Sequence, residues 1–477
     1  MSEIKENEVS YRDRISTVDE KGNRKWIYPK KPSGYWYNKR KLVSYLLLLL
    51  LFVLPFIKYK GEPLFLLNVL ERKFIILGVV FTPQDTHLFA IGMILLIIFI
   101  VFFTFVFGRL FCGWVCPQTI FMEMVYRRIE YAIEGDAHAQ IRLNKGPWNW
   151  DKIWKKTLKH IIFLVLAFIF ISLLLSLIVG IESIFEAFLN PGENKGLAGS
   201  ILIISLMFYY IFAFFREQVC TNVCPYGRMQ GVLLVDNSIV VHYDFVRGEQ
   251  RGTIKQRNLA SNTEEGKKEE FGDCIDCNNC VDVCPTGIDI RNGTQLECIN
   301  CTACMDACDE VMVKMKKPKG LIRYSSEISI KERKAFKLSK RAYAYIGVLS
   351  VIMVIFGFIA SQRVKVEALI LKTPGASYQY VPGDSSKIFN LYEYKLINKT
   401  SGEIENVRIE VEGIKDAQLQ VVPDPIEPIK EFSLAKGNMI LTIPVSEMKG
   451  YKTPVIFNVY SGKILLHKYK SNFSGPH

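Results

Sequence analysis

Five long apolar stretches constrain this chain more than any other feature of its sequence. A helix needs about 20 mostly apolar residues to cross the hydrocarbon core of a bilayer. The stretches that meet this requirement are 42–59, 87–108, 160–181, 198–215 and 343–360. Hydrophobic residues make up 49% of the 477 residues, which also favours several membrane spans. We therefore predict an α-helical membrane protein with about five transmembrane helices.

A sixth apolar stretch, 65–81, has a different character. Its centre holds Glu71, Arg72 and Lys73. Three charges at the middle of a bilayer would be costly. We expect this stretch to lie at the interface or to fold outside the membrane.

The net charge of +13 is unevenly distributed along the chain. Lys and Arg are concentrated in 1–41, 109–159 and 216–341, and they are scarce in 60–86 and 182–197. This alternation follows the positive-inside rule if the N-terminus is cytoplasmic. The charge thus indicates membrane topology and lipid contact, and we expect no nucleic-acid partner. Five spans then put the C-terminal tail on the outer face.

The 12 cysteines all lie between residues 112 and 308. An outer, oxidising compartment is where disulfides would be expected, yet the tail 362–477 contains no cysteine. The cysteines fall on the predicted cytoplasmic side, where thiols stay reduced. This distribution favours metal ligation or redox chemistry.

Eight of these cysteines repeat the spacing C-x2-C-x2-C-x3-C of bacterial ferredoxins. The two runs are Cys274, Cys277, Cys280 and Cys284, followed by Cys298, Cys301, Cys304 and Cys308. In two-cluster ferredoxins the fourth cysteine of each run ligates the other cluster. We therefore predict one [4Fe–4S] cluster on Cys274, Cys277, Cys280 and Cys308, and a second on Cys298, Cys301, Cys304 and Cys284. Structural zinc is the alternative that this double pattern disfavours.

The remaining cysteines form two C-x3-C-P motifs, each after an apolar stretch and an arginine. The residues are Cys112 and Cys116 after Arg109, and Cys220 and Cys224 after Arg216. We interpret them as an internal repeat of two-helix units that brings both pairs together. Residues four apart share one face of a helix, so each pair can present two sulfurs to one site. Soft sulfur sites select Cu(I), zinc or iron–sulfur clusters.

Two other interpretations of these pairs stay open. The cysteines could be small buried hydrophobes at helix ends, or redox-active dithiols whose thiol pKa Arg109 and Arg216 lower. His160 and His87 are weaker ligand candidates at the ends of apolar stretches. The polar residues of the loop 131–140 are interpreted as solvated: Glu134, Asp136 and His138.

The composition changes along the chain divide it into consecutive segments. We predict a basic cytoplasmic arm near the lipid headgroups (1–41), a four-helix membrane domain (42–245), a mobile linker (246–272), a ferredoxin-like module with a basic connector (273–341), a fifth transmembrane helix (342–361) and an outer domain (362–477). The outer domain alternates like strands at 388–398, 407–413, 439–445, 454–460 and 463–469. This pattern predicts an immunoglobulin-like β-sandwich.

Taken together, these segments resemble the CcoG (RdxA/FixG) family over about residues 22–330 and in the overall plan. The residues that carry the resemblance are FTPQD (81–85), FGRLFCGWVCPQT (107–119), IEGD (133–136), FREQVCTNVCPYGRMQ (215–230), VRGEQRG (246–252), CTACMDACDEVM (301–312) and GLIRY (320–324). Asp309 stands where a second motif proline would be, and GDAHAQ (135–140) departs from the more basic sequence expected there.

The resemblance implies an accessory protein of the bacterial inner membrane that assembles cbb3-type cytochrome c oxidase, with its C-terminal domain in the periplasm. The implied activity is reduction of Cu(II) to Cu(I), with Cys112, Cys116, Cys220 and Cys224 as candidate copper ligands. The partners would be a cytoplasmic electron donor, a copper chaperone or copper-exporting ATPase, and oxidase assembly factors. A quinol-linked electron conduit of the NapH/NosR type and a non-enzymatic assembly scaffold are the rival functions.

Overall fold

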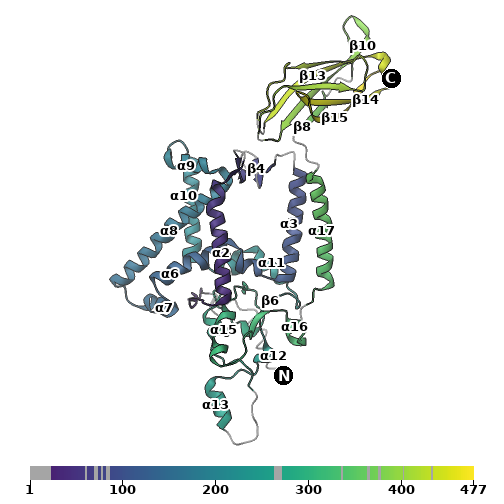
Figure 1. Cartoon of the computed structure of the whole chain (residues 1–477). Helices are drawn as coiled ribbons and strands as arrows, with labels where there is room; N and C mark the ends of the chain where they lie inside the picture. The colour runs from purple at the N-terminus through teal and green to yellow at the C-terminus, as the bar shows by residue number, and fades with distance from the viewer. Residues whose placement is uncertain are drawn as a thin grey trace. The chain divides into compact units, whose positions relative to one another are not determined.

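The structure is a computed structural model of the chain (Figure 1). It describes residues 23–59, 62–68, 73–76, 79–81, 86–262, 271–334, 337–361, 366–373, 378–400, 402–430, 433–448 and 450–476. By its internal contacts the chain divides into two compact units. The first comprises 1–55 and 91–353, and the second comprises 56–90 and 354–477. Each unit is described by itself.

Four of the described helices are long and apolar enough to cross a membrane. They are α3 (Thr86–Phe107), α8 (Trp150–Val179), α10 (Lys195–Tyr210) with its continuation η4 (Ile211–Phe215), and α17 (Lys340–Ser361). They coincide with the predicted stretches 87–108, 160–181, 198–215 and 343–360. Their lengths and apolar composition identify a membrane protein.

The first predicted span, 42–59, differs from the structure. Helix α2 (Tyr35–Val53) begins earlier, and the 3-10 turn η1 (Leu54–Phe56) follows it. Pro55 lies in this turn, and strand β1 (Lys58–Tyr59) comes next. The basic residues Lys39, Arg40 and Lys41 lie in the first half of the helix. Only its second half is purely apolar, so a fifth span stays a prediction.

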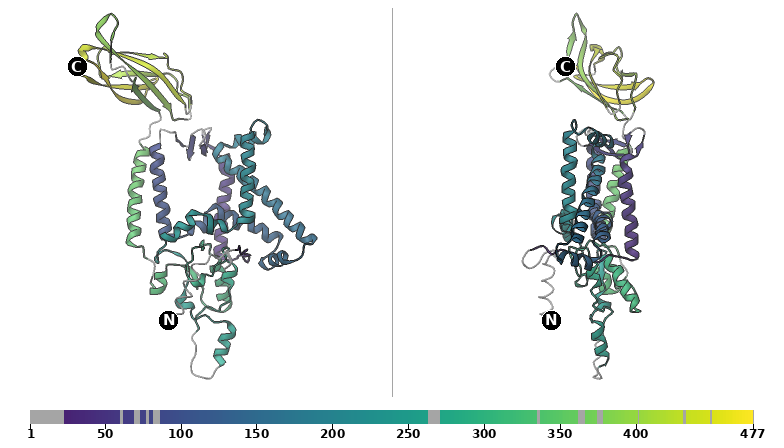
Figure 2. Two further views of the ribbon diagram at one scale, coloured as in Figure 1. Left: turned by 180° about the vertical axis from the view of Figure 1, so that it is seen from behind. Right: turned by 90° about the vertical axis from the view of Figure 1, so that its left-hand side faces the viewer.

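The long helices of the first unit pack in two groups, which Figure 1 and the left-hand view of Figure 2 separate. In one group, the ring of Phe105 on α3 lies 5.7 Å from that of Tyr345 on α17. In the other, α2 and α10 pack against α8. Its core is aromatic: the rings of Tyr126 and Phe212 stack at 4.7 Å, and Phe163 is fully buried beside them.

A chain of short helices joins α3 to α8 at one end of these helices. It consists of α4 (Leu110–Trp114), α5 (Pro117–Ile120), the π-helix η3 (Phe121–Tyr126), α6 (Arg127–Ile133) and α7 (Ala137–Lys145). Helix α9 (Ile181–Leu189) joins α8 to α10 at the other end (Figure 1).

The ferredoxin-like module follows α10 and belongs to the same unit. Its elements are η5 (Val219–Val223), α11 (Pro225–Leu233), β6 (Val240–Tyr243), α12 (Phe245–Gly248), α13 (Ile254–Asn262), α14 (Asn279–Asp282), η6 (Ile290–Asn292), α15 (Ala303–Lys314), β7 (Ile322–Ser325) and α16 (Glu327–Glu332). Strands β6 and β7 pair antiparallel and close the module.

The segment predicted as a mobile linker, 246–272, contains regular structure. It includes most of α12 and all of α13, although 263–270 lie outside the described residues. Arg257 on α13 donates hydrogen bonds to the carbonyl oxygens of Gly272 at 2.6 Å and Cys274 at 2.7 Å. These bonds attach the segment to the first ferredoxin motif. The polar composition alone suggested a linker, and it could not reveal these contacts because they join residues that are not adjacent in sequence.

The described part of the N-terminal arm packs on protein. The backbone N–H of Lys30 donates to Asp282 O at 2.8 Å, and that of Lys31 donates to a carboxylate oxygen of Asp136 at 2.8 Å. The buried side chain of Ile27 packs over Gly287. Residues 23–34 therefore lie against the ferredoxin-like module and α7, and the expected placement near the headgroups stays a prediction. Residues 1–22 lie outside the described part.

The second unit contains small sheets and a β-sandwich. Part of the stretch 65–81 forms the antiparallel strands β3 (Phe65–Asn68), β4 (Lys73–Ile76) and β5 (Val79–Phe81), and β2 (Glu62–Pro63) pairs with β1. This stretch is thus not a membrane helix in its described residues.

The immunoglobulin-like sandwich predicted for the tail is confirmed. One sheet has the order β12-β13-β10-β8, with β9 beside β10, and the other has the order β11-β14-β15. The strands are β8 (Val366–Lys372), β9 (Gln379–Val381), β10 (Asp384–Asn398), β11 (Val407–Glu412), β12 (Gln418–Val422), β13 (Leu434–Pro444), β14 (Lys452–Ser461) and β15 (Ile464–Ser474). The fully buried rings of Tyr392 and Phe457 meet at 5.3 Å between the sheets.

Candidate iron–sulfur and thiol sites

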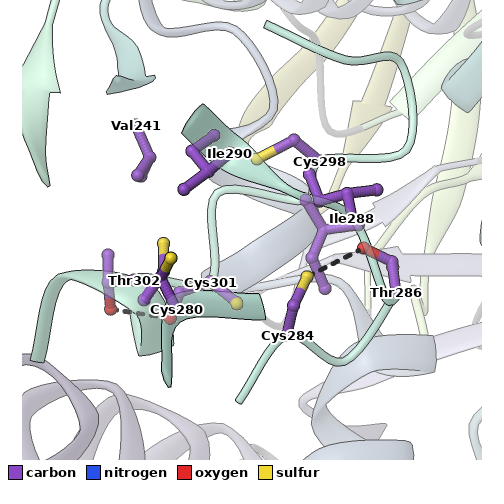
Figure 3. Close-up of a pocket in the computed structure, with 11 residues that line it drawn as sticks. Val241, Cys280, Cys284, Thr286, Ile288, Ile290, Cys298, Cys301 and Thr302 are labelled. Carbon is purple, nitrogen blue, oxygen red and sulfur yellow. Dashed lines mark hydrogen bonds between the residues drawn. The ribbon is translucent and has the colours of Figure 1, made fainter. Parts of the chain in front are cut away.

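The eight ferredoxin-type cysteines gather around two cavities in the module. The first cavity is lined by Cys274, Cys277, Cys280 and Cys308. The second is lined by Cys284, Cys298, Cys301 and Cys304, and Cys280 reaches it as well. Figure 3 shows the second cavity, in which the thiol of Cys284 lies 3.4 Å from the hydroxyl of Thr286. The grouping places Cys284 and Cys308 each with the other motif, as the spacing predicts.

The two motifs share an unusual backbone conformation that turns their cysteines inward. Asp276 and Asn300, each two residues after a first cysteine, have φ of 52° and 54°. Asn278 and Thr302, each one residue after a second cysteine, have φ of 59° and 66°. Residues with positive φ break any regular helix or strand. The short C-x2-C-x2-C segments can therefore curl around a common centre.

The fourth cysteines of the two motifs precede different residues. Pro285 comes directly after Cys284, and α14 ends before this pair. Asp309 comes directly after Cys308, so α15 continues to Lys314. The Asp309 side chain accepts a hydrogen bond from the backbone N–H of Gly320 at 2.8 Å. The missing proline thus gives the second motif a longer helix, and Cys308 still reaches the first cavity.

The cavities suit iron–sulfur clusters in their donors and walls. Among the described residues that line them there is no carboxylate, and apolar side chains such as Val241, Ile288 and Met312 complete the walls. Burial raises the pKa of the Cys280 and Cys298 thiols to about 12 and that of Cys301 to about 11. These thiols are therefore neutral until a metal centre displaces their protons, as cluster ligands require.

Cys112 and Cys116 do not share a helix face, contrary to the expectation from their spacing. Cys112 lies in α4, whereas Cys116 has ψ of 125° and precedes α5. The second pair repeats this arrangement, because Cys220 lies in η5 and Cys224, with ψ of 114°, precedes α11. Pro117 and Pro225 start the next helices, a position where proline is favourable because its missing N–H needs no partner.

The backbone turn between the paired cysteines is the same in both motifs. The N–H of Cys116 donates to Phe111 O at 2.9 Å, and the N–H of Cys224 donates to Val219 O at 2.8 Å. Both bonds span five residues. The internal repeat inferred from the sequence thus extends to the local backbone geometry.

The structure brings the two pairs into one neighbourhood, which we call the four-thiol site (Cys112, Cys116, Cys220 and Cys224). The thiols of the other three cysteines act electrostatically on Cys220. Gln230, which is fully buried, contacts the Cys112 sulfur through its amide nitrogen at 3.8 Å. Among the described residues no three His, Cys, Asp or Glu side chains are close enough to hold one bare metal ion. A single copper ion on three of these thiols therefore requires side-chain rotation.

The nearby arginines do not lower the pKa of the Cys112 and Cys220 thiols. Burial raises the pKa of Cys112 to about 11 and that of Cys220 to about 12, and the nearby Arg109 charge only partly offsets this effect. Arg216 instead forms a two-pronged ion pair with Glu130, at 2.9 Å for both bonds. At Cys112 and Cys220 the pKa shift is thus opposite in direction to the one that the interpretation as redox-active dithiols expects.

The other sequence candidates lie in structural networks. His160 Nδ1 lies 2.9 Å from the hydroxyl of Tyr209, and its ring stacks on Phe214. Glu134 is buried and pairs with Lys156 and Lys159, both at 2.9 Å, so the expectation of a solvated loop residue is wrong.

The two remaining loop candidates have different positions. The carboxylate of Asp136 caps the N-terminus of α7. His138 is exposed in that helix.

The four-thiol site touches the second cavity directly. Gly113, between Cys112 and Cys116, packs under the backbone of residues 299 and 300. A Cβ at this position would lie 2.8 Å from Asn300 O and closer still to Ile299 O. Cys112 also packs against the buried cluster formed by Val283, Ile299, Cys301 and Ala303.

Sequence reasoning missed the residues that hold this contact together. Arg40 Nε donates to Gly113 O at 2.6 Å from helix α2. The indole N–H of Trp114 donates to the hydroxyl of Tyr324 at 3.0 Å, and that hydroxyl donates to Asn300 O at 3.1 Å. The ring of Trp36 packs edge-on against those of Trp114 and Tyr324. The aromatic residues of the arm, such as Trp36, were visible in the sequence. Their packing partners Trp114 and Tyr324 are distant in sequence, so the contact could not be predicted.

Comparisons with known proteins agree with this architecture. Three family profiles match: a 4Fe-4S binding domain over 89–133, a 4Fe-4S dicluster domain over 215–327, and an IG-like fold at the C-terminus of FixG, described as a candidate oxidoreductase, over 356–476. The fold and the sites define a membrane-associated iron–sulfur electron-transfer protein.

Curated relatives make the assignment more specific. The chain is 30% identical to nitrogen fixation protein FixG of Rhizobium meliloti over 470 residues, covering 87% of each chain. It is 28% identical to protein RdxA of Cereibacter sphaeroides, covering 81% of this chain and 82% of that one. The chain belongs to the FixG/RdxA family.

Two more distant similarities accompany these. Ferredoxin-type protein NapH of Haemophilus influenzae is 24% identical over 200 residues, covering 39% of this chain and 63% of its own length. A crystal structure of a FixG-related protein from Vibrio parahaemolyticus matches 23% of this chain and 95% of its own, at 15% identity and a TM-score of 0.20. With so low a score, this last match bears on neither fold nor function.

Proposed function

We propose that this electron-transfer protein reduces Cu(II) to Cu(I) at the four-thiol site. The observation that carries the proposal is the direct contact of this site with the second cavity through Gly113 and the 299–300 backbone. A soft-metal site that packs against the wall of an iron–sulfur cavity can receive electrons from it. Thiolate ligands favour Cu(I), so binding of the product helps the reduction.

The proposed residues have separate roles. Cys274, Cys277, Cys280 and Cys308 would hold one [4Fe–4S] cluster, and Cys284, Cys298, Cys301 and Cys304 the other; such clusters supply one-electron reduction. Each Cu(II) ion takes up one electron and becomes Cu(I). A cytoplasmic one-electron donor restores the electron, and no atom is transferred in this step.

The biological setting is part of the same proposal. The FixG/RdxA membership and the four-thiol site support a role in delivering Cu(I) during assembly of cbb3-type cytochrome c oxidase. Copper would pass to a chaperone or a copper-exporting ATPase. The basic segments support a cytoplasmic N-terminus and cluster module in a bacterial inner membrane, with the sandwich in the periplasm as a docking domain for assembly factors.

The decisive experiment measures Cu(I) formation from Cu(II) by the reduced full-length protein without oxygen. Wild type is compared with a variant carrying Cys112→Ser, Cys116→Ser, Cys220→Ser and Cys224→Ser, at equal cluster absorbance. Copper reduction by wild type alone is the expected result. Equal rates in both proteins would contradict the proposal, because the four thiols would then be unnecessary.

One observation favours a second candidate function. The 4Fe-4S binding profile over 89–133 includes Cys112 and Cys116, and part of the chain is similar to NapH. The four thiols would then ligate a further iron–sulfur cluster in a quinol-linked conduit. Iron analysis separates the candidates, because the four-serine variant would lose iron in the conduit and keep all of it in the copper reductase.

A further inference from the structure

Two buried arginines, Arg40 and Arg109, lie where the four-thiol site meets the second cavity. Their exposed fractions are 2% and 4%. Arg40 donates to Gly113 O, and Arg109 donates to Gly227 O. In the part of the chain that the structure describes, neither guanidinium has a carboxylate within ion-pair distance. Nη2 of Arg40 and Nε of Arg109 also lack any hydrogen-bond partner.

The other two buried arginines of the described chain have carboxylate partners. Nε of each also lacks a hydrogen bond, so the contrast with Arg40 and Arg109 lies in the counter-charge. Arg127 pairs with Glu123 at 2.5 Å and with Glu217 at 3.2 Å. Arg216 pairs with Glu130 at 2.9 Å. A buried charge without a counter-charge is costly. The fold therefore tolerates Arg40 and Arg109 at a place where an anionic group can neutralise them.

The thiols around these arginines show where that group belongs. The Arg109 charge acts electrostatically on Cys112 and Cys220 of the four-thiol site and on Cys298 of the second cavity. The Arg40 charge acts on Cys301 of the same cavity. A [4Fe–4S] cluster with four thiolate ligands is an anion, and reduction makes it more negative. A cluster held by Cys284, Cys298, Cys301 and Cys304 in the second cavity would thus supply the counter-charge that these arginines lack.

The first cavity has no comparable excess of positive charge. Arg291 lines it, but its guanidinium pairs with Asp289 at 2.6 Å and with Asp276 at 2.5 Å. Cys277 at this cavity is also exposed to solvent. The two cavities therefore differ in their surrounding charge although their cysteine motifs are alike.

We propose that Arg40 and Arg109 are positioning residues that raise the reduction potential of the cluster in the second cavity and so direct electrons toward the four-thiol site. Nearby net positive charge stabilises the more negative, reduced state. The cysteines of the two cavities would hold clusters that exchange single electrons, so an electron given by a one-electron donor at the exposed first cavity would favour the second cavity, with no proton moved. The inference rests on the electron-transfer part of the proposed function and not on copper.

The test is a redox titration of the full-length protein, monitored by electron paramagnetic resonance under anaerobic conditions. Arg40→Gln and Arg109→Gln remove the charge, and Arg40→Lys and Arg109→Lys retain it. Arg323→Gln is the control for loss of an arginine charge that lines neither cavity. Arg323 already pairs with Asp244 at 2.8 Å. The signal of the second cavity is identified by its loss in a Cys284→Ser variant.

Each glutamine variant should lower the equilibrium constant for reducing the second-cavity cluster at least about tenfold, which is about 59 mV for one electron. The first-cavity signal should stay in place, and the lysine variants should recover most of the loss. If a glutamine variant loses only the second cluster and its lysine counterpart keeps it, the assignment is also supported. The proposed role of the arginines would be overturned by unchanged reduction potentials or by equal shifts in the potentials of both clusters. Loss of the second cluster in both the glutamine and the lysine variant would also overturn it. Copper reduction is not measured, so failure here leaves the copper proposal to its own test.

Discussion

Gly113 of the first C-x3-C-P motif lies against Asn300 of the second ferredoxin motif, with no room for a side chain between them. The two residues are far apart in sequence, and each lies between two cysteines of its motif. This close contact joins the four-thiol site to the second cavity beside the packing of Cys112 on the cluster that contains Cys301. It therefore allows a direct test of electron transfer between the two sites.

Gly113→Ala should slow this transfer without removing the clusters. The new methyl group would lie 2.8 Å from Asn300 O, so the 299–300 loop must move away. Small displacements of reacting groups can cost a hundredfold in rate. We expect reoxidation of the reduced protein by Cu(II) to slow about tenfold or more. Stopped-flow absorbance of the clusters measures the rate.

Gly192→Ala is the control, because an added Cβ there has no neighbour within 4 Å. A Gly113→Ala protein with normal cluster content and an unchanged rate would show that the contact is not on the electron path.

Single cysteine variants should group by cavity and not by sequence motif. Cys308 lines the first cavity with Cys277, whereas Cys284 lines the second with Cys301. Cys308→Ser and Cys277→Ser should therefore leave the same residual spectrum, and Cys284→Ser and Cys301→Ser should leave the other. Mössbauer spectra of iron-57-labelled protein provide the comparison. If Cys284→Ser matched Cys277→Ser instead, the crossed arrangement would be incorrect.

Asp306→Ala should loosen helix α2 from the ferredoxin-like module. The Asp306 carboxylate, on α15, accepts the backbone N–H groups of Trp36 at 3.1 Å and Tyr37 at 2.7 Å. It thus caps α2 from another helix, and loss of such a cap costs about 1 kcal/mol. Thermal unfolding in detergent, monitored by circular dichroism, should show the destabilisation.

Asp306→Asn should recover most of this stability, because an amide oxygen can also accept both bonds. Asp151→Ala, at an exposed ion pair, serves as the surface control. Equal stability of Asp306→Ala and wild type would mean that the cap contributes nothing.

The local patterns could be predicted because their causes are local. The apolar composition indicated α3, α8, α10 and α17, and alternation indicated most strands of the sandwich. The spacing of the ferredoxin motifs anticipated how their cysteines divide between two cavities. The helices and strands depend on residues close in sequence, whereas the crossed positions of Cys284 and Cys308 followed from the general rule for two-cluster ferredoxins.

The failures have a common physical origin in contacts between distant segments. Spacing alone could not show that Cys116 and Cys224 stand at helix breaks, because a five-residue turn and a regular helix both allow four-residue spacing. Spacing also could not show that Arg216 forms an ion pair with Glu130, whereas the charge of Arg109 acts on the Cys112 thiol. The contact of Gly113 with residues 299 and 300 depends on the folded unit as a whole.

The buried ion pairs of Glu134 predict how stability depends on pH. Burial alone would raise the pKa of this carboxyl, but the ammonium groups of Lys159 and Lys156 outweigh burial and lower the pKa below its usual value of 4.5. The contribution of the Glu134 ion pairs to the free energy of unfolding is therefore complete above pH 4.5, and it is lost as the pH falls through the lower folded-state pKa. Glu134→Gln should destabilise the protein by on the order of 2 kcal/mol at pH 7. Thermal unfolding from about pH 7 to pH 3 should show this difference shrinking toward zero at the acid end. A difference that stays constant over this range would mean that packing of the side chain, and not its charge, is responsible.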